Sequence, residues 1–407
     1  MIKEYSVGSL FAGVGGICLG INQARCGEKR FKIEWANEID QYPAITYREN
    51  FNHLLIEGDI QKIINPTLCD LERKELEIEL RNEKDEKKIK YLQNEIERCL
   101  KEKPEYEIKR NQILEKRIDL LDGGFPCQAF SIAGERKGFE DDRGNLFLSI
   151  VNLIKLLDPI HGKPRILFLE NVKNLVSHDS GKTYLVIKGE LEKLGYIIKE
   201  KVMNTMDFTD VPQNRERIFI LGFLKKEDAD KFTMFDRIND YYKVKHPNDR
   251  VKDIKNIIDN SINVENGKQY YYTKDKYPNY FISESEYNAL SSEKRKDVRI
   301  NLDESINEEY QFYQVRRGMY VRKNMSGVCP TLTANMGTGG HNVPLIKVKD
   351  GIRKLTPAET FKLQGFPVGD GYTLPKQSDA RLYKQAGNAV SVPVIKLIAE
   401  ELLKILD

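Results

Sequence analysis

The sequence predicts an α/β fold built on a doubly wound sheet, and three observations lead to this prediction. A buried strand at 5–11 runs into a glycine-rich turn at 12–16, after which the apolar spacing of a helix begins. A second strand at 32–36 ends beside acidic residues, and a third unit closes at 58–60. This alternation of strands and helices is typical of doubly wound sheets.

Three later segments extend the same sheet. A strand is predicted at 118–121, and apolar runs follow at 166–169 and 217–221. Uninterrupted apolar runs of this length are typical of strands that helices cover on both faces.

The 407 residues are enough for two or three domains. We divide the chain into a first domain at 1–224, a smaller mixed and β-rich domain at 225–375, and a segment at 376–407 that returns to the first domain.

A charged insert interrupts the first domain at about 66–117. It is dense in Glu, Lys and Arg, and its apolar residues Ile89, Leu92, Ile96 and Cys99 keep a three-four spacing, which predicts an inserted helical arm. Two interpretations stay open: a solvated helix pair, or a surface that contacts a nucleic-acid backbone or a protein partner.

Composition excludes several classes of protein. The 65 basic and 62 acidic residues give a net charge of +3, which does not exclude a nucleic-acid partner, because basic residues can cluster in one cleft. The six cysteines lack the close spacing of a zinc site, so neither a metal nor a disulfide framework is implied. A mean hydropathy of −0.53 argues against a membrane span, and the first residues lack a secretory signal. We therefore expect a cytoplasmic protein.

Tyrosines cluster in the second domain, at 270–272 and at Tyr277, among Lys and Arg. Aromatic side chains interleaved with basic residues can stack on nucleic acid, but they also form small cores. The pattern favours a small core.

The glycine turn is a candidate ligand site. Gly13, Gly15 and Gly16 allow a ligand to approach the backbone, and Glu38 at the end of the next strand can hold a ribose hydroxyl. The wider three-glycine fingerprint is absent, which disfavours a pyrophosphate ligand. Phe11 either stacks on an adenine ring or belongs to the core.

A second candidate site surrounds Cys127, which follows Pro126 at the end of a predicted strand. Most isolated cysteines of cytoplasmic proteins are inert core residues. Here, however, Glu170 ends the next strand, and Arg215 and Arg217 stand at alternate positions of another, where they would project to one side. Together these side chains indicate one site at the carboxyl edge of the sheet.

Six motifs in a fixed order resemble those of the DNA (cytosine-5)-methyltransferases of bacterial and phage restriction-modification systems. They are FAGVGG at 11–16, PCQ at 126–128, ENV at 170–172, QNRER at 213–217, KLTP at 354–357 with LQGFP at 363–367, and QAGNAV at 385–390. The resemblance covers nearly the whole chain except the charged insert and the variable middle.

The resemblance implies a Rossmann-like catalytic domain and a covalent mechanism. Cys127 would attack C6 of cytosine, Glu170 would act at N3 and Arg217 at O2. Asn171 and Arg215 would order the surrounding loop and the glutamate.

The resemblance also implies S-adenosyl-L-methionine as methyl donor, with S-adenosyl-L-homocysteine as product and no metal. The implied cofactor-binding residues are Phe11, Gly13, Gly15, Glu38, Ile39, Asp59, Ile60, Asn388 and Val390. The sequence departs from the family at one of them: many members carry Trp where this chain has Ile39, and Trp35 lies earlier on the strand.

Double-stranded DNA is the implied partner, with the target base flipped out of the duplex. The segment at 131–144 resembles the family's closing loop, and 329–340 resembles the core of a target-recognition domain. The implied DNA-binding residues are Gln128, Ser131, Arg136, Arg143, Arg316, Arg317, Arg322, Thr331, Leu332 and Thr333.

We expect a monomer that is associated with the nucleoid and functionally paired with a restriction endonuclease, without a stable complex. The alternatives are a transfer-RNA methyltransferase of the same fold, a nicotinamide oxidoreductase and a silent DNA-binding regulator. The tripeptide around Cys127 argues against the first, and the joint presence of the cysteine, glutamate and arginines argues against the other two.

Overall fold

The computed structural model describes residues 2–125, 146–241, 250–296, 301–316, 320–338 and 342–407. The chain forms two compact units. The first comprises Met1–Val202, Arg217–Asp236 and Ile398–Asp407, and the second comprises Met203–Glu216 and Arg237–Leu397.

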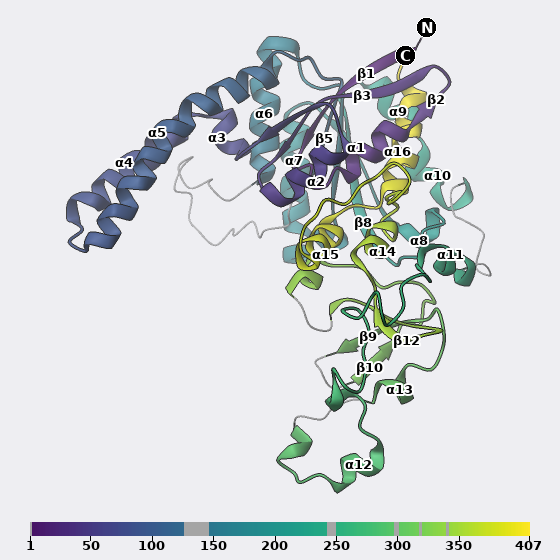
Figure 1. Cartoon of the computed structure of the whole chain (residues 1–407). Helices are drawn as coiled ribbons and strands as arrows, with labels where there is room; N and C mark the ends of the chain where they lie inside the picture. The colour runs from purple at the N-terminus through teal and green to yellow at the C-terminus, as the bar shows by residue number, and fades with distance from the viewer. Residues whose placement is uncertain (1, 126–145, 242–249, 297–300, 317–319, 339–341) are drawn as a thin grey trace. The chain divides into compact units, whose positions relative to one another are not determined.

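The first unit is built on a mixed sheet flanked by helices, which confirms the predicted α/β fold (Figure 1). Within the described residues the strand order is β2-β3-β1-β5-β6-β8-β7, and β4 also pairs with β3. The strands are β1 (Lys3–Leu10), β2 (Arg25–Cys26), β3 (Lys29–Glu38), β4 (Leu54–Glu57), β5 (Leu120–Gly124), β6 (Ile166–Val172), β7 (Ile197–Asn204) and β8 (Glu216–Phe223).

The sheet differs from the prediction in the direction of β8 and in two strands that were not predicted, the short β2 and the edge strand β7. β3, β1, β5 and β6 run parallel, but β8 pairs antiparallel with β6. β7 was not predicted because Lys199, Glu200 and Lys201 interrupt its apolar residues, a pattern that a half-exposed edge strand tolerates.

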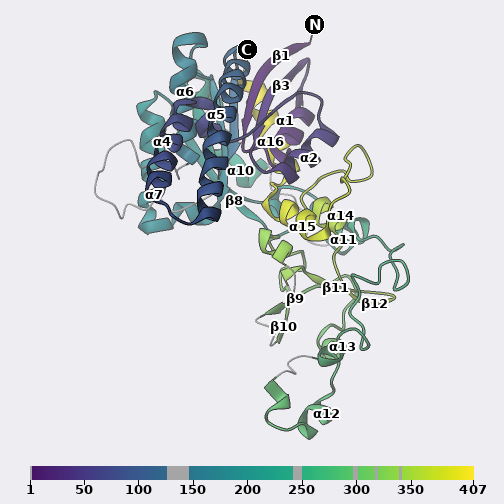
Figure 2. The same ribbon diagram turned by 60° about the vertical axis from the view of Figure 1, so that its left-hand side comes forward.

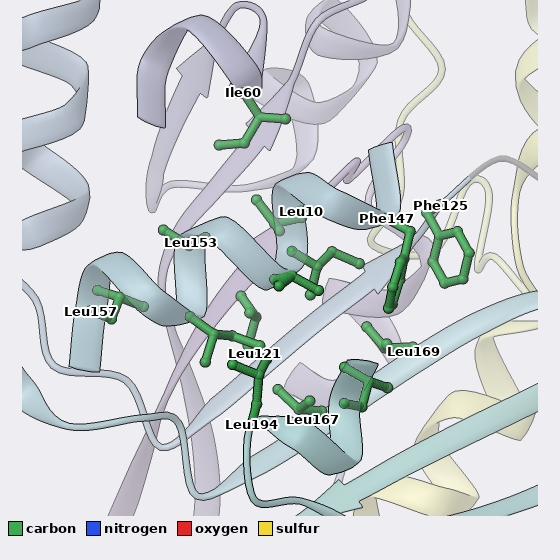
Figure 3. Packing of buried hydrophobic residues seen from close by; sticks show 14 of the residues in the cluster. Leu10, Ile60, Leu121, Phe125, Phe147, Leu153, Leu157, Leu167, Leu169 and Leu194 are labelled. Atoms are coloured by element: carbon green, nitrogen blue, oxygen red, sulfur yellow. The ribbon is translucent and has the colours of Figure 1, made fainter. Parts of the chain in front are cut away.

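One large hydrophobic core lies between the sheet and the helices α3, α6 and α7. Figure 3 shows Leu10, Leu121, Leu167 and Leu169 of the strands facing side chains of these helices, such as Ile60 and Phe147. The helices of this unit are α1 (Gly16–Gln23), α2 (Gln41–Asn50), α3 (Ile60–Ile64), α6 (Leu146–His161), α7 (Lys182–Lys193) and α9 (Lys226–Lys231).

The charged insert forms two long helices, α4 (Thr67–Asn82) and α5 (Glu86–Leu114), which lie side by side in Figures 1 and 2. Asp85 caps α5 by accepting hydrogen bonds from two backbone amides of its first turn. The buried residues of α5 recur every seven positions, so they form one stripe: Leu92, Cys99, Tyr106 and Ile113.

The second unit holds a small antiparallel sheet in the order β10-β9-β11-β12. Its core contains Tyr272, Leu302 and Tyr313, and Tyr277 stacks on Tyr272, so the tyrosine cluster belongs to a small core, as favoured. The strands are β9 (Phe312–Arg316), β10 (Tyr320–Lys323), β11 (Leu345–Val348) and β12 (Gly351–Lys354).

The second unit also contains short helices. They are α11 (Arg250–Ile257), α12 (Glu284–Ala289), α13 (Leu302–Ser305), α14 (Pro357–Lys362) and α15 (Asp379–Asn388), with the single turn α8 (Thr205–Phe208) and the 3₁₀ turn η5 (Ala334–Thr338). Two helices contribute residues to both units: α10 (Met234–Tyr241) and α16 (Val392–Ile405). In the part of the chain that the structure describes, no helix is both long and apolar enough to span a membrane.

The first prediction concerns Gly8, which pairs with Trp35 in the centre of the sheet. A Cβ at Gly8 would lie 2.4 Å from Cζ2 of the fully buried Trp35 ring. We expect Gly8→Ala to lower the free energy of unfolding by about 1–3 kcal/mol, measured by urea denaturation.

Gly189→Ala is the matched control. Gly189 lies in α7, and no atom lies within 4 Å of its added Cβ, so this change should stabilise the chain by up to about 1 kcal/mol. A Gly8→Ala variant as stable as the wild type would contradict the packing described for Trp35.

Candidate active site

The ends of β1, β3 and β4 form the first part of the site. These strands run parallel, so their carboxyl ends meet at one edge of the sheet. Two backbone hydrogen bonds join the loops after β1 and β4 to the end of β3: Ala12 N donates to Asn37 O at 2.9 Å, and Gly58 N donates to Glu38 O at 3.0 Å.

The turn after β1 has an unusual backbone. Phe11, Gly13 and Gly15 have φ of 54°, 57° and 83°, and only Phe11 carries a side chain that disfavours this conformation, at a cost of roughly 1–3 kcal/mol. Open space lies where a Cβ on Gly13 would point, whereas a Cβ on Gly15 would collide with the ring of Phe51. The turn therefore leaves its backbone open at Gly13.

Glu38 holds this turn in place. Its carboxylate accepts hydrogen bonds from the backbone amides of Gly13 at 2.7 Å, Ile39 at 2.9 Å and Asp40 at 2.7 Å. Burial raises the pKa of Glu38, and the hydrogen bonds from these amides oppose the rise. The Ile39 side chain beside it is 67% exposed, which leaves an apolar surface open at the strand end.

Asp59 and Ile60 begin α3 at the same edge. The Asp59 carboxylate caps the helix by accepting from Gln61 N at 2.9 Å. The Ile60 side chain, by contrast, is buried in the main core.

Glu170 and Arg217 form an ion pair at the ends of β6 and β8. The antiparallel register pairs Val172 with Arg217, so Glu170 and Arg217 are diagonal neighbours on facing strands. Arg217 Nε lies 3.1 Å from Glu170 Oε1, and the two side chains are only 14% and 10% exposed. The Glu170 carboxylate also lies against Gly124 of β5, where an added Cβ would be 3.6 Å from Oε2.

Asn171 ties this pair to the end of β5. Its Nδ2 donates to the carbonyl of Phe125 at 2.8 Å, and its Oδ1 accepts from Val172 N. Phe125 precedes Cys127 by two residues. The predicted residues Cys127, Gln128, Ser131, Arg136 and Arg143 themselves lie outside the described residues.

The side chains of Arg215 and Arg217 bind different partners, although they were expected to project to the same side. Arg215 belongs to the second unit and is 2% exposed. Its guanidinium donates to the carbonyls of Leu332, Gly387 and Ala389. Arg215 thus joins the segment at 329–333 to the end of α15.

The other predicted residues of the second unit differ in exposure. Leu332 and Val390 are buried, whereas Arg322, Thr333 and Asn388 are exposed. The Thr331 hydroxyl donates to the carbonyl of Asn214 at 2.6 Å. Arg317 and the side chain of Arg316 lie outside the described part of the structure.

Gly387 allows close packing of two backbones. A Cβ at this position would lie 2.1 Å from the carbonyl carbon of Thr333, so only glycine fits. The buried amides of Gln213 and Gln364 complete the network: Gln213 Nε2 donates to Leu363 O, and Gln364 Nε2 donates to Ala386 O at 2.8 Å. Gln364 stands in the LQGFP motif at 363–367, but its buried hydrogen bond to Ala386 was missed, because a motif does not show which carbonyl a side chain contacts.

Asp122 of β5 was also missed. It is fully buried, and the Ser9 hydroxyl donates to its Oδ1 at 2.6 Å. Burial raises the pKa of Asp122 to about 8, and burial followed by the negative charge of Asp122 raises the pKa of Cys18 to about 12. An acidic residue in an apolar strand next to the Cys127 segment was the available signal.

Comparisons with known proteins agree with one another. Residues 5–70 and 67–404 match the family model described as C-5 cytosine-specific DNA methylase. The chain is 42% identical over 399 residues to the Type II methyltransferase M.Bsp6I of Bacillus sp. (strain RFL6), with 98% of each chain covered. It is 32% identical over 406 residues to the Type II methyltransferase M.HaeII of Haemophilus aegyptius, covering 100% of this chain and 95% of that one.

Solved structures share the fold. The S. pombe Dnmt2 methyltransferase superposes with a TM-score of 0.57 at 17% identity and 97% coverage of both chains. A putative DNA modification methyltransferase encoded within an E. coli prophage gives a TM-score of 0.56 at 21% identity, covering 98% of this chain and 99% of that one.

The second prediction follows from the buried Asp122. Its pKa is about 8 in the folded chain against 3.8 ordinarily, so between these pH values the folded state holds a proton that the unfolded chain has released. Stability therefore falls as pH rises through this window. Asp122→Asn can still accept from Ser9 but cannot ionise, so its stability should lack this pH dependence. We expect its free energy of unfolding to rise relative to that of the wild type as pH rises.

The measurement is urea denaturation of both proteins at several pH values from about 5 to about 8. Identical pH dependence in the two proteins would show that Asp122 ionises normally in the fold.

Proposed function

Because the chain belongs to the C-5 cytosine-specific DNA methylase family and is a DNA (cytosine-5)-methyltransferase of the restriction-modification type, we propose that it methylates C5 of a flipped-out cytosine through a covalent Cys127 adduct. The observation that carries this mechanism is the buried pair of Glu170 and Arg217, tied through Asn171 to the end of the strand that leads to Cys127.

In the proposed reaction the Cys127 thiolate forms a bond to C6 of cytosine, and the electrons of the C5=C6 bond move toward N3 and O2. C5 would then form its new bond to the methyl group as the bond between that group and the sulfur of its donor breaks. Loss of the C5 proton restores the C5=C6 double bond and breaks the bond between C6 and sulfur. The thiolate of Cys127 is thereby regenerated.

Glu170 and Arg217 would stabilise the charge that forms when Cys127 attacks. In this proposal Glu170 delivers a proton to N3 when Cys127 attacks and accepts it back before the thiolate is expelled, and the guanidinium of Arg217 donates to O2. The ion pair between them supports these roles, because it fixes both side chains in a largely buried position before the base arrives. Asn171 would act indirectly, through its hydrogen bond to the carbonyl of Phe125.

S-adenosyl-L-methionine would supply the methyl group and leave as S-adenosyl-L-homocysteine. The residues at the strand ends fit it: the backbone is open at Gly13, Ile39 offers an exposed apolar surface, and Asp59 lies on the neighbouring turn. Glu38 already accepts from three amides at 2.7–2.9 Å, so its remaining acceptor capacity would serve the ribose hydroxyls.

We assign recognition of the duplex to the second unit, with Thr331, Thr333 and Arg322 among the residues that face DNA. Base flipping costs a few kcal/mol and exposes the target base to the catalytic groups. We further propose that the chain acts as a monomer on nucleoid DNA in the cytoplasm and protects that DNA from a cognate restriction endonuclease.

The third prediction tests the nucleophile. Plasmid DNA from a methylation-deficient host expressing the wild type should show cytosines that resist bisulfite conversion in one short sequence context. Cys127→Ala should abolish this protection, because it removes the thiolate that forms the bond to C6.

Circular dichroism of the purified variant serves as the control that it remains folded. Protection that survives in Cys127→Ala would contradict the covalent mechanism. If the soluble wild type protects no cytosine, RNA becomes the substrate to test, and the assignment of the second unit to duplex recognition fails.

A further inference from the structure

The charged helix α5 reaches the proposed cofactor edge through one residue, Tyr106. This tyrosine belongs to the buried stripe of α5 and is 8% exposed. A Cβ on Gly58 would lie 2.9 Å from Cε1 of its ring, and its hydroxyl is hydrogen-bonded to the backbone of Asp59. The ring therefore packs directly on the turn between β4 and α3.

The same turn is connected to Glu38. Gly58 N donates to the carbonyl of Glu38, and Asn37 Nδ2 donates to the carbonyl of Gly58 at 3.0 Å. The turn is thus held from one side by the end of β3 and from the other side by Tyr106. Gly58 has a φ of 134°, a conformation that does not favour residues with side chains, so contacts must define it.

An ion cluster fixes the helix that begins at this turn. Lys62 of α3 lies 2.6 Å from Glu72 of α4 and 3.5 Å from Glu102 of α5. The Lys62 side chain is 18% exposed, so solvent screens these pairs less than surface pairs. Both inserted helices therefore anchor α3, whose capping residue is Asp59.

Other residues of the inserted helices face solvent. Ile78 of α4 and Tyr91 of α5 are 60% and 59% exposed. A helix pair that is only solvated would not place a buried tyrosine against a turn of the proposed site.

We propose that Tyr106 is a positioning residue for the cofactor: it fixes the Gly58–Asp59 turn and so sets the affinity for the adenosine part of S-adenosylmethionine. This inference rests on the proposed function, which places the cofactor at this edge. It gives the charged insert a role that neither open interpretation included.

The test compares Tyr106→Phe and Tyr106→Ala with the wild type. Calorimetry measures the Kd of S-adenosylmethionine without DNA, and steady-state assays measure kcat and the KM for cofactor and DNA separately. Loss of the hydrogen bond and the ring should raise the cofactor Kd and KM about five- to tenfold in Tyr106→Ala, with a smaller rise in Tyr106→Phe. The KM for DNA and kcat should stay within about twofold of the wild type.

Tyr91→Ala is the matched control, since Tyr91 lies on the same helix but is exposed, and its cofactor Kd should not change. If Tyr106→Ala does not fold, Tyr106→Phe decides alone. A wild-type cofactor Kd in Tyr106→Phe, or an equal rise in the KM for DNA, would overturn the inference. A wild type that binds no S-adenosylmethionine would contradict the proposed function itself.

Discussion

The site depends on the antiparallel pairing of β6 with β8. Glu170 lies near the end of β6 and Arg217 at the start of β8. Burying either charge alone would be costly, so the register that brings Glu170 to Arg217 satisfies both. A buried ion pair is weak evidence for stability, because apolar residues of similar volume often serve as well. Its place at the end of β6, beside the segment that leads to Cys127, fits the chemistry proposed above.

The residues of the QNRER motif at 213–217 make contacts in both units. Gln213 and Arg215 bind backbone carbonyls of the second unit, and Arg217 pairs with Glu170 in the first. An arginine that donates to three carbonyls specifies the path of several loops at once, because each carbonyl would otherwise be buried without a donor. Gly387 adds to this by allowing direct backbone packing.

Much of the first unit could be predicted because buried strands have a strong pattern. The apolar residues that begin β5 and β6, Leu120 and Leu121 in one and those at 166–169 in the other, predict these strands and bring Glu170 to the carboxyl edge of the sheet. The pattern could not show the partners of Arg215, because these are backbone carbonyls, which every residue carries. It could place Tyr106 on the same face of its helix as Cys99, but not identify the Gly58 turn as what that face covers.

The most direct test of the role of Glu170 is the rate at which the chain forms a covalent adduct with duplex DNA that carries 5-fluorocytosine. The fluorine cannot leave as the C5 proton does, so the adduct accumulates and can be measured on a denaturing gel. We expect Glu170→Gln to slow adduct formation at least about a hundredfold, because the proton for N3 is lost, while the Kd of S-adenosylmethionine stays unchanged. Adduct formation at the wild-type rate in Glu170→Gln would remove Glu170 from the chemistry.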